Sequence, residues 1–173
     1  MMILEFLTLS SILIMLSKLY SIMEKNFVVK SDYRIFQVYD SQSLKIFKYI
    51  RILLLISGSF EFAFKNSLPG VSIFLPGIGL LLFGLTLRLL AILSLGPYWS
   101  FNIVLYENHK LIRKGIYRFF RHPAYLGNLY LTGLFVCMNA NITSLFSLLF
   151  IVSFYLYRTR IENRVIMSLK GTT

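Results

Sequence analysis

The sequence is poor in the residues that stabilise small soluble or metal-containing domains. Only 14% of its 173 residues are charged, and acidic residues are scarce, with seven Asp and Glu against eighteen Lys and Arg. A single cysteine, Cys137, excludes a disulfide within the chain and leaves the cellular compartment open. The two histidines, His109 and His122, are far apart and have no cysteine beside them, so their spacing predicts no metal site.

The start of the chain also lacks basic residues. Residues 1–6 include Glu5 but no Lys or Arg. Cleaved signal peptides begin with a positively charged segment. We therefore expect the first apolar segment to be retained.

Apolar and aromatic residues take the place of the missing charges. Hydrophobic residues make up 57% of the chain, which includes sixteen Phe and eleven Tyr, and the mean hydropathy is +0.70. This composition is typical of an integral membrane protein. The net charge of +11 lies in short blocks between apolar runs, which indicates membrane topology and a lipid bilayer as partner, not nucleic acid.

Five apolar segments predict the fold. We predict an all-α integral membrane protein with about five transmembrane helices, of which the last two form a short helical hairpin around the polar turn Asn139–Asn141. The segments are Met2–Met23, Ile46–Phe64, Val71–Leu95, Ala124–Cys137 and Ile142–Tyr157.

The basic residues predict the orientation of these helices. They gather in regions 24–51 and 96–122 and in the tail from Arg158, and the loops between hold almost none. With five spans all three regions fall on one side, which the positive-inside rule makes cytoplasmic. Arg88 lies deeper in the third segment. It is either a functional intramembrane charge or a side chain that reaches the interface, and the sequence leaves both open.

The segment "LGPYWSFNIVLYENHKLIRKGIYRFFRHPAYLG", residues 95–127, combines basic, aromatic and helix-breaking residues. Gly96-Pro97 is expected to end the third helix, and Pro123 suits the first turn of the next one. His122 then lies at the mouth of that helix, where free N–H groups and the helix dipole favour an anion. An interfacial aromatic belt with snorkelling arginines is the alternative for the single residues.

The sequence resembles the isoprenylcysteine carboxyl methyltransferase family. The resemblance rests on "LRLLAILSLGPYWSFNIV", "HKLIRKGIYRFFRHPAYLG" and the tail "YRTRIENRVIMSLKG", roughly the last half of the chain. It implies a membrane methyltransferase that uses S-adenosylmethionine in a cytoplasmic cofactor pocket. It also implies one membrane domain, 1–173, with N-terminal spans in 1–70 and the catalytic core in 71–173.

The resemblance also implies roles for single residues. Arg158 faces the acceptor as catalytic and substrate-binding residue, and Glu162 and His122 are the other catalytic candidates. The residues that would hold the cofactor are His109, Lys110, Leu111, Ile112, Tyr117, His122, Pro123, Ala124, Tyr125 and Glu162.

Two departures from the family pattern stand in the tail. The family often has a Glu-Glu pair where this chain has Glu162-Asn163, and it usually continues past the final glycine, here Gly171, with acidic residues and tyrosines. These departures bear on acceptor choice more than on the cofactor.

The chemistry of methyl transfer fits these residue types. In-line displacement from a sulfonium needs orientation and exclusion of water more than an acid, and aromatic faces stabilise the cation. Arg158 and Glu162 are spaced i and i+4, so they share a helix face, although an ordinary surface ion pair would have the same spacing. A carboxylate acceptor is already ionised and needs no general base.

The predicted function is therefore methylation of a lipophilic carboxylate, such as a C-terminal isoprenylcysteine, at the endoplasmic reticulum or a bacterial plasma membrane. The alternatives are methylation of a lipid amine or phenol (phospholipid or polyketide), an NADPH-dependent sterol-type reductase, or a scaffold without activity.

Overall fold

The computed structural model describes residues 15, 35–40, 42–65, 67, 69–106 and 114–170. The longer elements are β1 (Ile35–Asp40), α2 (Gln42–Lys65), α3 (Val71–Leu95), β2 (Ile103–Tyr106), α4 (Pro123–Leu126), α5 (Tyr130–Cys137) and α6 (Asn141–Lys170). Short 3₁₀ helices cover Gly96–Tyr98, Gly115–Arg118 and Gly127–Leu129.

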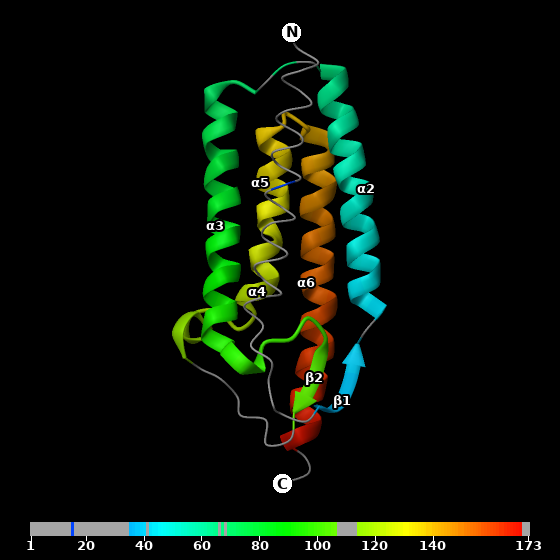
Figure 1. Ribbon diagram of the computed structural model, residues 1–173, viewed down its shortest axis with the longest axis vertical. Helices are drawn as coiled ribbons and strands as arrows, with labels where there is room; N and C mark the ends of the chain where they lie inside the picture. The colour runs from blue at the N-terminus through cyan, green and yellow to red at the C-terminus, as the bar shows by residue number, and fades with distance from the viewer. Residues whose placement is uncertain are drawn as a thin grey trace.

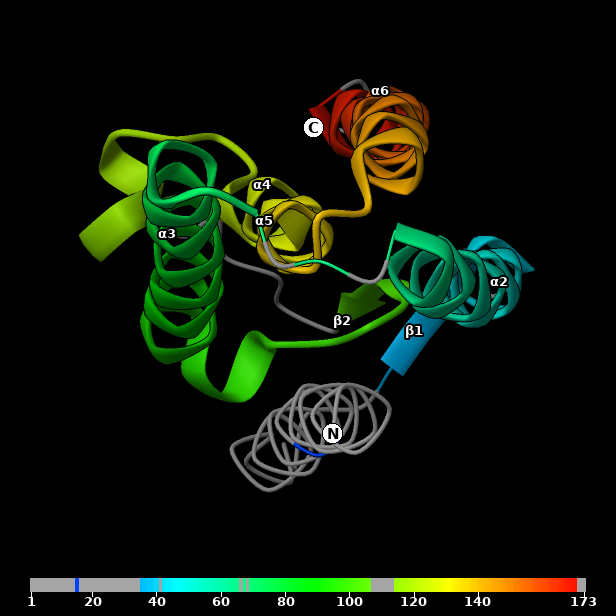
Figure 2. The ribbon, with the colours of Figure 1, turned by 90° about the horizontal axis from the view of Figure 1, so that it is seen from above.

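The long helices run side by side along the longest axis of the molecule. The small sheet lies beyond the ends of α2 and α3 and beside the last turns of α6 (Figure 1). Seen from above, α5 lies between α3 and the pair formed by α2 and α6 (Figure 2). The buried core follows this arrangement, because it consists of apolar residues from α2, α5 and α6 that centre on Leu131 and Phe135.

The two strands are an addition to the all-α prediction. β1 and β2 form an antiparallel pair in which Asp40 lies opposite Ile103 and Ile35 opposite Tyr106. Apolar and polar residues alternate in the sequence just before β2. Its partner strand, β1, precedes α2 and lies far away along the chain. Only the tertiary fold brings the two together.

The helical prediction is confirmed most closely at α3, which spans Val71–Leu95 as expected. Gly96 ends it with a positive φ of 52°, and a 3₁₀ turn with Pro97 follows. In the part of the chain that the structure describes, two stretches are long and apolar enough to cross a membrane, Val71–Tyr98 and Asn141–Val165. The predicted span Met2–Met23 lies outside the described residues except for Met15, so the count of five stays a prediction.

The last two helices do form a hairpin, but its second arm is not short. The turn contains Asn139 with a positive φ of 56°, and α6 continues through the predicted basic tail to Lys170. The predicted fifth segment, Ile142–Tyr157, ended where the charged residues begin, whereas the helix continues beyond them. The backbone stays helical there because polar residues are compatible with a helix that leaves the apolar layer.

Glycines allow α3 and α5 to approach closely. A Cβ on Gly133 would meet the backbone of α3, at 2.7 Å from Gly77 O and 2.8 Å from Leu81 Cα. A Cβ on Gly84 would meet Gly127 O at 2.8 Å. Small residues at such positions let transmembrane helices pack backbone against backbone.

The outer faces of the long helices are apolar. Large hydrophobic side chains such as Phe64, Leu82 and Leu149 are exposed along α2, α3 and α6. Soluble monomers rarely expose apolar patches of this extent. The faces therefore fit an acyl-chain environment.

Candidate active site

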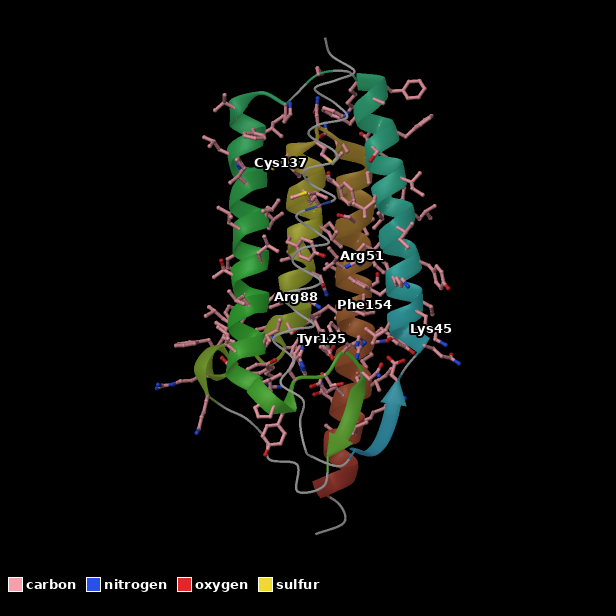
Figure 3. All side chains as sticks on the ribbon, viewed as in Figure 1. Lys45, Arg51, Arg88, Tyr125, Cys137 and Phe154 are labelled. Atoms are coloured by element: carbon pink, nitrogen blue, oxygen red, sulfur yellow. The ribbon has the colours of Figure 1, made fainter. Side chains whose placement is uncertain are left out.

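The site candidates that the structure describes gather at the end of the bundle that carries the sheet. Figure 3 shows Arg88, Tyr125 and Phe154 toward this end and Cys137 toward the other. A shallow, open hollow of about 310 Å³ lies elsewhere, between α2 and the start of α6, lined by Ser57, Phe60, Glu61, Phe64, Ile142 and Thr143. This hollow is not the predicted cofactor pocket, since none of the motif residues lines it.

A polar cluster joins α4 to the far part of α6. The Tyr125 hydroxyl donates a hydrogen bond to Glu162 Oε2 at 3.0 Å, and His122 Nδ1 lies 3.2 Å from the same oxygen. The His122 and Tyr125 rings are stacked, with centroids 5.8 Å apart. Glu162 Oε1 accepts no hydrogen bond from the described residues, so one carboxylate oxygen stays available to a ligand.

Arg158, one turn before Glu162, is almost fully buried at 1% exposure. Its Nη1 donates to Ser43 Oγ at 3.2 Å and its Nη2 to the Phe101 carbonyl at 3.0 Å. The guanidinium also lies over the rings of Tyr125 and Phe154, at 5.3 and 5.6 Å from their centroids. Among the described residues, neutral groups and aromatic faces hold this buried cation, and such surroundings favour an anionic ligand.

Within the described residues, the buried Nε of Arg158 has no hydrogen-bond partner. An unsatisfied buried donor is costly, and donors of this kind are commonly satisfied by ligands or ordered water. The Nε–H is therefore the position at which Arg158 can take up an acceptor oxygen.

Tyr117 lies near this cluster from the turn that precedes α4. Gly115 opens the turn with a positive φ of 57°, a conformation that other residues rarely adopt. Tyr117 packs against the small core formed by Ala91, Ile92, Trp99 and Ala124. Burial, and then the negative charge of Glu162, raise the pKa of the Tyr117 phenol, so the group stays protonated at neutral pH.

The predicted fourth helix, Ala124–Cys137, is broken into α4, a 3₁₀ turn and α5. Arg88 from α3 provides a physical reason, because its Nη1 donates to the Ala124 carbonyl at 3.2 Å and to Asn128 Oδ1 at 2.8 Å. The Ala124 carbonyl is the one that a continuous helix would pair with the Asn128 N–H. Arg88 thus ties α3 to α4. Since α4 has four residues, its dipole is too small to support the predicted anion site at His122.

The structure brings together a large part of the predicted site. His122, Tyr125, Arg158 and Glu162 meet, with Pro123 and Ala124 buried beside them in α4. His109, Lys110, Leu111 and Ile112 lie outside the described residues.

The structure also separates the alternatives that the sequence left open. The alternative that Arg158 and Glu162 form an ordinary surface ion pair is wrong. Arg158 is buried, and its guanidinium donates hydrogen bonds to Ser43 and Phe101. The aromatic residues of the segment do not share one environment, since Phe119 is 77% exposed whereas Trp99 is buried, and the aromatic belt stays a prediction.

Sequence reasoning missed the residues that hold Arg158. Ser43 lies at the start of α2, and its backbone N–H donates to Asp40 Oδ1 at 3.0 Å. Asp40 three residues before Ser43 is a helix N-cap pattern. That pattern can locate the start of α2, but it carries no sign of the contact with α6.

Comparison with known proteins adds one match. The family model described as isoprenylcysteine carboxyl methyltransferase (ICMT) family matches residues 77–168, which is more than half of the chain. A search of curated proteins found none that matches.

Proposed function

Since the chain belongs to the isoprenylcysteine carboxyl methyltransferase family, a family of membrane methyltransferases, we propose that it O-methylates the carboxylate of a lipophilic acceptor such as a C-terminal isoprenylcysteine. The methyl donor is S-adenosylmethionine. The observation that carries the proposal is the Arg158 guanidinium, which is buried and held by neutral groups, and whose Nε has no hydrogen-bond partner among the described residues.

The residues around Glu162 suit the donor. S-adenosylmethionine, when bound, supplies a methyl group whose bond to the sulfonium sulfur breaks as the acceptor oxygen bonds to the methyl carbon, with the electron pair going to sulfur. The free oxygen of Glu162 can accept from an ammonium or hydroxyl group. The stacked rings of His122 and Tyr125 lie beside this carboxylate, and aromatic rings stabilise a cation. Tyr117 stays neutral near them.

Arg158 would hold the acceptor carboxylate and orient one of its oxygens towards the methyl group. A carboxylate is ionised at neutral pH, so no proton has to be removed. The catalytic contribution of the protein is then orientation and exclusion of water, to which the burial of Arg158 at 1% exposure contributes. Arg158 is the substrate-binding residue, and Glu162 and His122 position the donor.

We place the site at the cytoplasmic face of a multi-pass protein, in the endoplasmic reticulum or a bacterial plasma membrane. Three basic residues at this end of the helices support this: Lys45 in the first turns of α2, Arg121 two residues before α4, and Arg160 in the second half of α6. A water-soluble donor would enter from this side, and a lipid acceptor from the bilayer.

A lipid amine or phenol is the second candidate acceptor, in a phospholipid or a polyketide. The pair of His122 and Glu162, 3.2 Å apart, favours it, since such an acceptor must lose a proton and the pair can take it. An NADPH-dependent reductase is the weakest alternative, because the family match is to methyltransferases.

The test is methyl transfer by the purified protein in lipid vesicles, with donor labelled on the methyl group and acetylated farnesylcysteine as acceptor. We expect label that mild base releases as a volatile product, as from a carboxyl ester. Base-stable label on a lipid would support the amine or phenol instead. Donor binding without any label would refute both.

Variants of Arg158 test its role. Arg158→Ala, and Arg158→Lys, which keeps the charge but loses the planar fork, should raise the acceptor KM and leave donor affinity mostly intact. Arg160→Ala is the matched control, because Arg160 is an exposed arginine of the same helix. If the Arg158 variants lose donor binding and keep acceptor use, the assigned role is wrong.

A further inference from the structure

The two hydrogen-bond acceptors of Arg158 lie next to different strands of the sheet. Asp40, the last residue of β1, lies opposite Ile103, the first residue of β2. Phe101, whose carbonyl accepts from Nη2, stands just before β2, and Ser43, whose hydroxyl accepts from Nη1, stands just after β1. Antiparallel pairing therefore brings both acceptors to one end of the sheet, where α6 passes (Figure 1).

Ser43 is itself held in place. Its backbone N–H donates to Asp40 Oδ1 at 3.0 Å, and both residues are buried. This contact caps the first turn of α2 and fixes the direction of the Ser43 side chain relative to the sheet. The orientation of the guanidinium thus depends on residues that precede the family match at 77–168.

The choice of a serine has an electrostatic consequence. A carboxylate in contact with Arg158 would neutralise the guanidinium and compete with an anionic ligand. The hydroxyl of Ser43 holds the same group without neutralising it. Asp40 Oδ1 accepts from the Ser43 N–H, whereas the buried Asp40 Oδ2 has no hydrogen-bond partner within the described residues. Anchoring of Nη1 and Nη2 leaves Nε as the donor without a partner within the described residues.

We propose that Ser43, held by Asp40, is a positioning residue of the acceptor site, and that the N-terminal part of the chain thereby completes a site whose other residues lie in the family-matched region. This inference rests on the proposed function, in which Arg158 binds the acceptor carboxylate. Ser43 contacts neither the donor nor the acceptor and acts through Arg158.

The test compares Ser43→Ala with Ser57→Ala in the vesicle assay with acetylated farnesylcysteine. Both serines belong to α2 and hydrogen bond to a side chain of α6, Ser57 through Thr143 Oγ1 at 3.1 Å. Ser43→Ala should raise the acceptor KM about tenfold, which corresponds to the loss of one hydrogen bond to a charged group, and leave the donor Kd unchanged. Ser57→Ala should change neither, and Ser43→Thr should restore the acceptor KM.

Equal acceptor KM values for Ser43→Ala and Ser57→Ala would overturn the inference. If Ser43→Ala does not fold, Ser43→Cys serves in its place, because it keeps the volume and replaces a good acceptor by a weak one. Arg158→Lys, measured in parallel, separates the two proposals. If Arg158→Lys leaves the acceptor KM unchanged, the proposed role of Arg158 is wrong. If Arg158→Lys raises the acceptor KM but the Ser43 variants keep the wild-type value, only the role of Ser43 is wrong.

Variants of Asp40 test how it holds Ser43. Asp40→Asn keeps an oxygen that caps helices well, so its acceptor KM should match the wild type. Asp40→Ala removes the cap and should raise the acceptor KM as Ser43→Ala does. A rise of the same size in both variants would mean that the charge of Asp40 acts directly, and the positioning route through Ser43 would be wrong.

Discussion

The close approach of α3 and α5 predicts a large difference between two Gly→Ala substitutions. Gly133 lies on α5 against the α3 backbone, and a methyl group there would come within 2.7 Å of Gly77 O and 2.8 Å of Leu81 Cα. Backbone atoms cannot rotate out of the way as the end of a side chain can. Gly133→Ala therefore requires the two helices to separate.

The magnitude follows from two opposing terms. Overpacking of a tight contact costs about 1–3 kcal/mol, and backbone contacts belong at the upper part of that range. Replacing Gly by Ala inside a helix stabilises the helix by up to about 1 kcal/mol. We expect Gly133→Ala to lose about 2 kcal/mol of unfolding free energy.

Gly79→Ala is the matched control, because it lies on α3 and a methyl group there would meet nothing within 4 Å. It should gain up to about 1 kcal/mol from helix propensity alone. The difference between the two variants is then about 3 kcal/mol, or a separation in Tm of about 6 °C or more for a chain of this size.

Thermal unfolding of the detergent-solubilised variants, followed by circular dichroism, measures this separation. Equal Tm values for Gly133→Ala and Gly79→Ala would refute the close packing of α3 on α5. The result would also remove the support for α4, which precedes α5 and carries Tyr125.

Two further predictions concern charged groups that join helices. Glu61 accepts hydrogen bonds from the backbone N–H groups of Ile142 and Thr143, at 3.0 and 2.9 Å. In the same unfolding assay, Glu61→Gln should lower the unfolding free energy by about 1–3 kcal/mol. The KM values should stay unchanged, because Glu61 lies at the far end of the bundle from Arg158. Arg88→Gln should weaken donor binding, measured by titration calorimetry, because Arg88 holds the Ala124 carbonyl next to the motif; unchanged donor affinity would mean that α4 keeps its place without Arg88.

The elements that the sequence predicted well are those whose causes are local. Twenty-five consecutive residues of α3 are mostly apolar, and Gly96 and Pro97 follow immediately, so both ends of the helix could be placed. The spacing of Arg158 and Glu162 likewise placed both on one face of α6, and both contact Tyr125. Helical geometry alone determines such neighbours.

The elements that were missed have causes distant in the chain. The break after α4 involves Arg88, which is 40 residues from Asn128, its hydrogen-bond partner. The strand β1 exists because β2 pairs with it, and the burial of Arg158 depends on Ser43, 115 residues away. No local pattern of hydrophobicity or turn residues records these contacts.

The sequence by itself therefore determined the apolar composition and the helix α3, because composition and the residues that end a helix are local properties. Its motif indicated the family through resemblance, and the family model agrees. Only the tertiary structure decided that Arg158 is buried, that neutral groups hold it and that a sheet from two distant segments supplies them. Its hydrogen-bond partners become neighbours only when β1 and β2 pair and α6 packs against them.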